Sequence, residues 1–117
     1  MSYKRKTGKI GEDLACNYLQ NNGYKVLERN FLCRQGEIDI IAQDKSEKVF
    51  IEVKTRTNKK YGEPADSVTN EKQKHIIKAT KYYLYKNFIK NEYIRLDIIE
   101  VYLYKNYYRI NHIKQIM

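Results

Sequence analysis

The chain lacks tryptophan, and its 117 residues include a single proline and two cysteines. It also lacks any apolar run near the roughly 18 residues that a membrane-spanning helix needs, and no apolar segment follows its basic start. Without a secretory signal, Cys16 and Cys33 should stay reduced. Together with His75 and His112 they lack the ligand spacing of a structural zinc site. We therefore expect a soluble, cytoplasmic protein with no membrane partner.

Acidic residues are in deficit, because 14 Asp and Glu stand against 23 Lys and Arg, which gives a net charge of +9. Lysine and arginine near phosphates release condensed counterions, so this excess favours DNA as a partner. A drift in codon usage toward lysine would give the same total charge. The positions favour the partner, since basic residues gather within 4–9, 54–60 and 72–90. The candidate phosphate contacts are Arg56, Lys59, Lys60, Lys72, Lys74 and Lys78.

The apolar spacing predicts two helices, at residues 9–22 and 70–91, and Asn70 with Gln73 resembles a capping pair. Alternating apolar and polar residues predict strands at 24–32, 37–42, 49–56, 93–104 and 107–112. Residues 58–66 contain Gly62 and the only proline, Pro64, and should form a loop.

The chain length allows one domain, residues 1–117. The order helix, three strands, helix, strand and terminal hairpin places helices where they can cover both faces of a sheet. We therefore expect an α/β fold with a mixed central sheet flanked by helices. The strands at 37–42 and 49–56 are joined by a short connection and should pair antiparallel.

Three charged residues should meet on this pair of strands. Glu52 and Lys54 are two apart, so they project from the same face, and Asp39 lies on the neighbouring strand. Two adjacent carboxylates repel unless a hard cation lies between them, and carboxylate oxygens are the ligands that Mg²⁺ and Mn²⁺ prefer. Lys54 beside such an ion could activate water or neutralise charge on a phosphate. The competing interpretation is an exposed sheet face with cross-strand ion pairs, which the apolar neighbouring residues disfavour.

Glu12 is a further candidate. It falls at the edge of the apolar half of the first helix, from which its side chain could reach a metal directly or through water. The alternative is that Glu12 is a first-turn acid at the positive end of its helix.

The run Gly36-Glu-Ile-Asp-Ile-Ile41, followed by Ile51-Glu-Val-Lys-Thr-Arg56, resembles the signature of the PD-(D/E)xK nuclease superfamily. It also closely resembles the YraN-like family of small bacterial proteins related to Holliday-junction resolvases. The resemblance covers nearly the whole chain, although Ile38 replaces the proline of the superfamily's name. Its further matches are Gly8-x-x-Gly11-Glu-x-x-Ala15, Tyr61-Gly-x-Pro64, Val68 with Lys72-Gln73, and Arg95-x-Asp97.

The resemblance implies a restriction-endonuclease-like, resolvase-like core of order α-β-β-β-α-β followed by a C-terminal hairpin. It implies that Asp39 and Glu52 ligate Mg²⁺ or Mn²⁺ and that Lys54 is the catalytic lysine. Glu12 would match the first-helix acid of the resolvase-like branch, and Gln73 a helical glutamine beside the active site. Glu37 faces the same way as Asp39 and would assist.

We therefore predict a metal-dependent endonuclease that selects branched or end-containing DNA by shape rather than by sequence. The alternative is a nucleic-acid-binding protein that keeps the fold without turnover. Its DNA binding would be salt-dependent and would survive EDTA. The 12 tyrosines offer a third reading, a surface for bases or for a second subunit. A homodimer would supply the two active sites that symmetric cutting needs.

Overall fold

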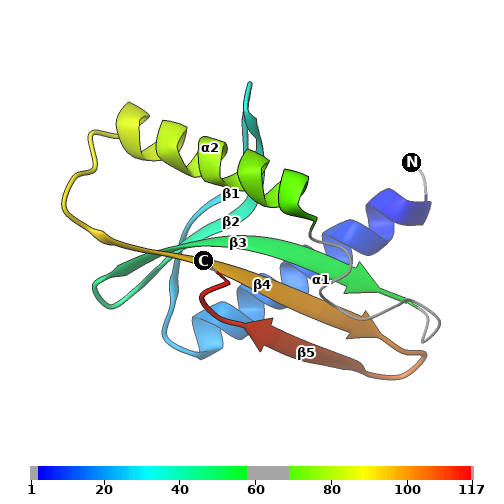
Figure 1. The fold of residues 1–117 in the computed structure, drawn as a ribbon. Coiled ribbons are helices and arrows are strands. Elements are labelled where there is room, and N and C mark those ends of the chain that lie inside the picture. Colours follow the sequence, from blue (N-terminus) through cyan, green and yellow to red (C-terminus); the bar gives the residue numbers. More distant parts are fainter. Residues whose placement is uncertain (1–2, 58–68, 117) are drawn as a thin grey trace.

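The computed structural model describes residues 3–57 and 69–116 (Figure 1). Its elements follow the order predicted from the apolar spacing: helix, three strands, helix, strand and a final hairpin strand. They are α1 (Tyr3–Asn21), β1 (Lys25–Cys33), β2 (Gly36–Asp44), β3 (Glu47–Arg56), α2 (Asn70–Lys86), β4 (Tyr93–Leu103) and β5 (Tyr108–Ile113).

The five strands form one mixed sheet in the order β1-β2-β3-β4-β5. β1, β2 and β3 pair antiparallel, β3 and β4 pair parallel, and β5 returns antiparallel to β4. A parallel pair needs a long crossover, and α2 lies within it. The predictions of a mixed sheet and of an antiparallel β2–β3 pair are therefore confirmed.

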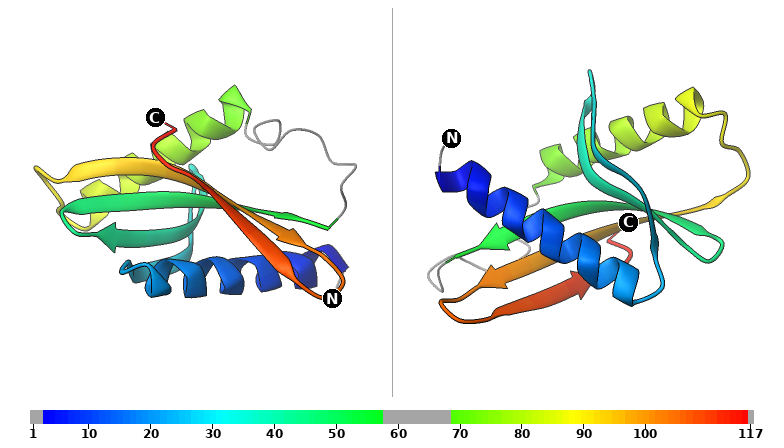
Figure 2. Two further views of the ribbon diagram at one scale, coloured as in Figure 1. Left: turned by 90° about the horizontal axis from the view of Figure 1, so that it is seen from below. Right: turned by 180° about the vertical axis from the view of Figure 1, so that it is seen from behind.

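The two helices cover opposite faces of the sheet (Figures 1 and 2). On one face Leu19 of α1 packs with Ile40 and Ile51 in the first core cluster. On the other, Ile76 of α2 packs with Phe50 in the second cluster. Residues alternate between the two clusters along β3, as the pleat of a strand requires. Both faces of the central strands are thus buried in a single α/β unit.

Gly11 sets how closely α1 approaches the end of β3. A methyl group added at Gly11 would overlap the side chain of Thr55, so only glycine permits this contact. The close approach brings Glu12, the next residue, to the end of the sheet where β3 finishes.

Some element boundaries differ from the predictions. α1 begins at Tyr3 rather than at residue 9. The prediction missed this early start because the first turns are polar and lack helical apolar spacing. α2 ends at Lys86, and Phe88 adopts a positive φ of 55° that ends the predicted continuation to residue 91. Thr69 rather than Asn70 caps α2, since its extended backbone lets the hydroxyl accept the Lys72 N–H at 3.1 Å. The predicted Asn70–Gln73 capping pair is wrong.

The Arg95-x-Asp97 motif forms a buried network at the end of the sheet where β2 turns into β3. Arg95 Nη2 lies 2.9 Å from Asp97 Oδ2, and its Nη1 lies 2.9 Å from Glu47 Oε1. Asp97 also contacts His112 Nε2 at 2.7 Å, which ties β4 to β5. This motif therefore supports the fold rather than the predicted acidic site. Neither helix, as far as the chain is described, has an apolar stretch long enough to cross a bilayer.

Candidate functional site

β2 and β3 separate at the predicted acids. Their paired register ends at Ile40 and Ile51, so Asp39 and Glu52 are the next residues along the two strands. There the backbone N–H of Val53 donates to Asp39 Oδ2 at 2.8 Å, and the side chain takes the place of a ladder carbonyl. This bond directs the Asp39 carboxylate toward β3 and toward Glu52, which confirms the predicted proximity of the two acids.

The two carboxylates are buried, with Asp39 and Glu52 each 8% exposed. Burial, together with a hydrogen bond and the negative charge from Glu52, raises the pKa of Asp39 to about 9. The hydrogen bond from Val53 opposes this rise. Near neutral pH, and with no metal ion bound, Asp39 therefore keeps its proton. The alternative of an exposed, ion-paired sheet face is wrong for these two residues.

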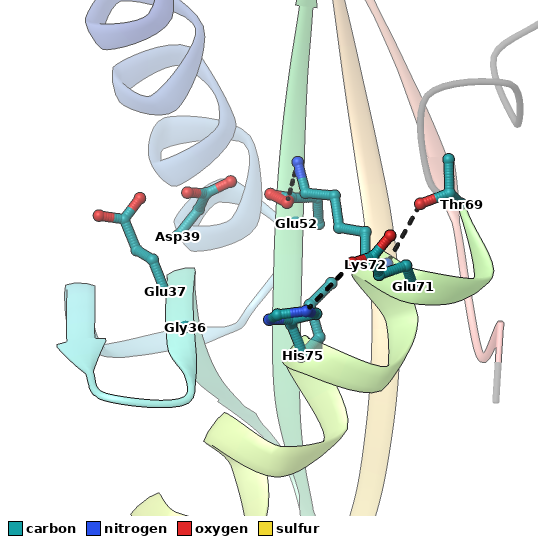
Figure 3. Close-up of a pocket in the computed structure, with 9 residues that line it drawn as sticks. Gly36, Glu37, Asp39, Glu52, Thr69, Glu71, Lys72 and His75 are labelled. Atoms are coloured by element: carbon teal, nitrogen blue, oxygen red, sulfur yellow. Dashed lines mark hydrogen bonds and ion pairs between the residues drawn. The ribbon is translucent and has the colours of Figure 1, made fainter.

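Two lysines complete the site. The Lys72 ammonium lies 3.1 Å from Glu52 Oε2 and reaches it from the first turn of α2 (Figure 3). Burial lowers the pKa of Lys54, and the hydrogen bond and charge of the neighbouring Lys72 lower it further. Burial acts to lower the pKa of Lys72 as well, but Lys54 and Glu52 together raise it. The result is a charged cluster of Asp39, Glu52, Lys54 and Lys72, named here the acid–lysine cluster.

Two open cavities meet at the acid–lysine cluster. The first, of about 410 Å³, lies between β2 and the start of α2 (Figure 3). The second, of about 560 Å³, reaches across to α1. Both are lined by Glu37, Asp39, Glu52 and Lys72, so solvent and ligand can reach the carboxylates from two sides.

Glu12 lies near the cluster but has a partner of its own. It lines the second cavity, and its charge contributes to the raised pKa of Asp39. Its Oε1 lies 3.5 Å from Arg29 Nη2 on β1. Because α1 begins at Tyr3, Glu12 lies more than two turns inside the helix, and the first-turn alternative is wrong.

The other predicted site residues are dispersed. Gln73 is half-buried and is not among the described residues that line the two cavities. Arg56 is half-buried at the end of β3, where it pairs with Tyr102 of β4. Lys74 and Lys78 are exposed on α2. Lys59 and Lys60, with the rest of the predicted loop and its Tyr61-Gly-x-Pro64 motif, lie outside the described residues.

Sequence reasoning placed Lys72 on the DNA-binding side of α2 and missed its contact with Glu52. It also missed Thr69 and His75, which line the first cavity. His75 lies 3.3 Å from the Gln35 carbonyl through Nδ1, so α2 is fixed against the β1–β2 turn. Thr69 was the available signal, because a threonine at this position marks the start of a helix. The helix start in turn determines which side chains lie in the first turn.

The donor set fits a metal that needs few protein ligands. Within residues 3–57 and 69–116, no three His, Cys, Asp or Glu side chains group closely enough to hold an ion. Mg²⁺ keeps several waters and is commonly bound through one or two carboxylates, which is what Asp39 and Glu52 offer.

The fold and the site define an α/β protein in which two buried carboxylates meet two half-buried lysines at one end of a mixed sheet. Residues 11–101 match the Uncharacterised protein family UPF0102, and the chain belongs to that family. This is the YraN-like family that the sequence motifs indicated, so that prediction is confirmed.

Its relatives cover almost the same length. The chain is 50% identical over 113 residues to a UPF0102 protein of Clostridioides difficile, and the aligned region covers 97% of this chain and 96% of that protein. It is 45% identical over 114 residues to a UPF0102 protein of Clostridium perfringens, and the aligned region covers 96% of this chain and 93% of that protein. A UPF0102 protein of Caldanaerobacter subterraneus is 47% identical over 100 residues, 86% of this chain and 82% of that protein.

Proposed function

We propose that this protein is a Mg²⁺- or Mn²⁺-dependent endonuclease that hydrolyses DNA phosphodiester bonds. The observation that carries the proposal is the buried pair Asp39 and Glu52, brought together where β2 and β3 separate. Lys54 lies two residues beyond Glu52 and completes the nuclease-like pattern. The element order α-β-β-β-α-β, with α1 and α2 on opposite faces, supports a restriction-endonuclease-like core.

Asp39 and Glu52 would hold the ion. A divalent ion bound there would polarise a phosphate oxygen and lower the pKa of a water ligand. To bind it, Asp39 releases the proton that burial and Glu52 retain. Lys72 leaves Glu52 and turns to the phosphate, which its half-exposed, flexible side chain permits.

Lys54 is suited to proton transfer. Burial and the neighbouring Lys72 lower its pKa, so a larger fraction of Lys54 is the neutral amine than for a lysine in water. A neutral amine beside the scissile phosphate can accept the proton of the attacking water. When protonated again, it stabilises the charge that develops on the phosphate oxygens.

The basic residues would hold the DNA backbone. Phosphate contacts give affinity and position without reading bases, so we propose that DNA shape, such as a branch or an end, selects the substrate. The residues proposed for this role are Arg56, Lys59, Lys60, Lys74 and Lys78.

The test is cleavage of branched, flapped and linear DNA with Mg²⁺. Wild type should cut, EDTA should stop it, and Asp39→Ala or Glu52→Ala should each lower the rate at least about 100-fold. Glu28→Ala, which removes an exposed carboxylate from β1, is the matched control and should cut normally. Salt-dependent binding of all substrates with no cleavage would instead support the binding-only alternative. Equal cleavage by wild type and both site variants would overturn the assignment of the site.

A further inference from the structure

The outer side of α2 carries a stripe of exposed side chains, of which the proposed function uses only Lys74 and Lys78, as contacts to the DNA backbone. The buried residues of α2, among them Ile76 and Tyr83, face the sheet. At about 100° per residue, four exposed residues fall within about 60° on the opposite side. These are Lys74, Lys78, Lys81 and Tyr85, named here the outer stripe.

The charge of the outer stripe suits a polyanion. The only acid in α2 is Glu71, in its first turn. Within residues 3–57 and 69–116, none of the three lysines forms an ion pair. Their charges are therefore available to phosphates along the whole stripe.

The stripe changes from lysines to aromatic residues toward the end of α2. Tyr85 is 80% exposed and Phe88, just beyond the helix, is 88% exposed, the highest values among the described large apolar residues. Tyr82 differs, because it stacks against Phe31 at 6.3 Å between ring centroids. The ring of Tyr85 thus has no comparable packing role among the described residues, and its face is open to a planar ligand.

The direction of α2 links this stripe to the site. Thr69 and Lys72, at the start of the helix, line the first cavity, and the helix runs away from it along the sheet (Figure 1). At 1.5 Å per residue, Tyr85 lies about 20 Å along the axis from Lys72. That distance corresponds to about six nucleotides at a stacked spacing of 3.4 Å.

We propose that the outer stripe binds an unpaired strand, so that the substrate is DNA in which a single-stranded arm leaves a duplex near the cavity. This inference rests on the proposed function for the presence of DNA at the cavity. The lysines hold the phosphates of the arm, and Tyr85 stacks on one of its bases. Basic residues followed by an exposed aromatic face are how proteins bind single strands without reading their sequence.

The test measures binding in EDTA, where no cut is expected, with duplexes that carry a single-stranded arm of two or twelve nucleotides. For wild type, the longer arm should tighten binding about tenfold, since only that arm reaches Tyr85. Tyr85→Ala should lose most of this gain and keep only the part that the lysines supply, whereas Tyr85→Phe, which keeps the ring, should retain it. Tyr107→Ala removes a tyrosine that is 63% exposed beyond β4 and should also retain it. A blunt duplex without an arm serves as the control, and wild type and the three variants should bind it equally.

Equal affinity for both arms in wild type, or an undiminished gain in Tyr85→Ala, would overturn the inference. Light scattering can also overturn the inference. If wild type is a dimer, and Tyr85→Ala is a monomer that keeps the arm-length gain, the outer stripe is a subunit interface. A protein that shows the tyrosine-dependent gain but never cuts with Mg²⁺ would overturn the proposed function alone.

Discussion

The Lys72 ammonium lies 3.1 Å from Glu52 Oε2, where it neutralises one of two buried carboxylates. Lys72 therefore competes with any metal ion for Glu52. A phosphate that attracts Lys72 away would free the carboxylate. DNA binding and metal binding should consequently strengthen each other, because linkage between two ligands is reciprocal.

Replacing Lys72 should increase the affinity for metal in the absence of DNA. We expect Lys72→Met to bind Mn²⁺ about tenfold more tightly than wild type, by removing an adjacent positive charge. Lys74→Met loses the same charge from an exposed position of the same helix and should change the affinity less than about twofold. Calorimetric titration with Mn²⁺ measures both. Equal effects of the two substitutions would show that Lys72 does not compete for the site.

The affinity for Mn²⁺ should rise with pH. Asp39, whose pKa is raised to about 9, must lose a proton before it can ligate the ion. Between pH 7 and 8.5 we therefore expect the affinity for Mn²⁺ to rise about tenfold per pH unit, and to level off above the pKa of Asp39. Asp39→Asn has no such proton and should show weak binding without this slope. A pH-independent affinity in wild type would show that Asp39 holds no proton that the ion must displace.

The metal-free protein should become less stable as pH rises. The folded state keeps the Asp39 proton up to about pH 9, whereas the unfolded chain releases it near the ordinary value of 3.8. The contribution of Asp39 to stability is thus fully present below that lower value and is lost on the way to pH 9. Thermal unfolding of wild type and Asp39→Asn between pH 6 and 9 measures the difference, and the variant should have the flatter profile.

Two glycines of α1 should respond in opposite directions. Gly11→Ala should cost about 1–3 kcal/mol, because the methyl group would overlap the side chain of Thr55. Gly8→Ala meets nothing within 4 Å and should gain up to about 1 kcal/mol from helix propensity. Chemical denaturation of the two variants provides the comparison. Similar stability in both would show that α1 does not approach β3 closely.

Strand alternation was enough to predict the centre of the site. Glu52 and Lys54 share a face because they are two residues apart on one strand. Asp39 is close to them because the β2–β3 connection is short. The alternation did not show that the two strands separate at Asp39, since that depends on a side chain replacing a backbone acceptor.

The partners of Lys72 and Glu12 could not be predicted. Lys72 meets Glu52 because the first turn of α2 lies beside the point where β2 and β3 separate, and the helical pattern alone sets no such position. Glu12 meets Arg29, which is remote in sequence and is brought near by the packing of α1 on β1. The early start of α1 was hidden for a related reason, because its first residues are polar and have no apolar stripe to mark them.

The proposed metal centre is tested most directly by the anomalous signal of Mn²⁺ in crystals of the protein grown at pH 8 and soaked with the ion. We expect one peak bridging the Asp39 and Glu52 carboxylates, with the Lys72 ammonium displaced from Glu52. No peak at saturating Mn²⁺, with Lys72 still in contact with Glu52, would contradict the claim that these carboxylates form a metal centre.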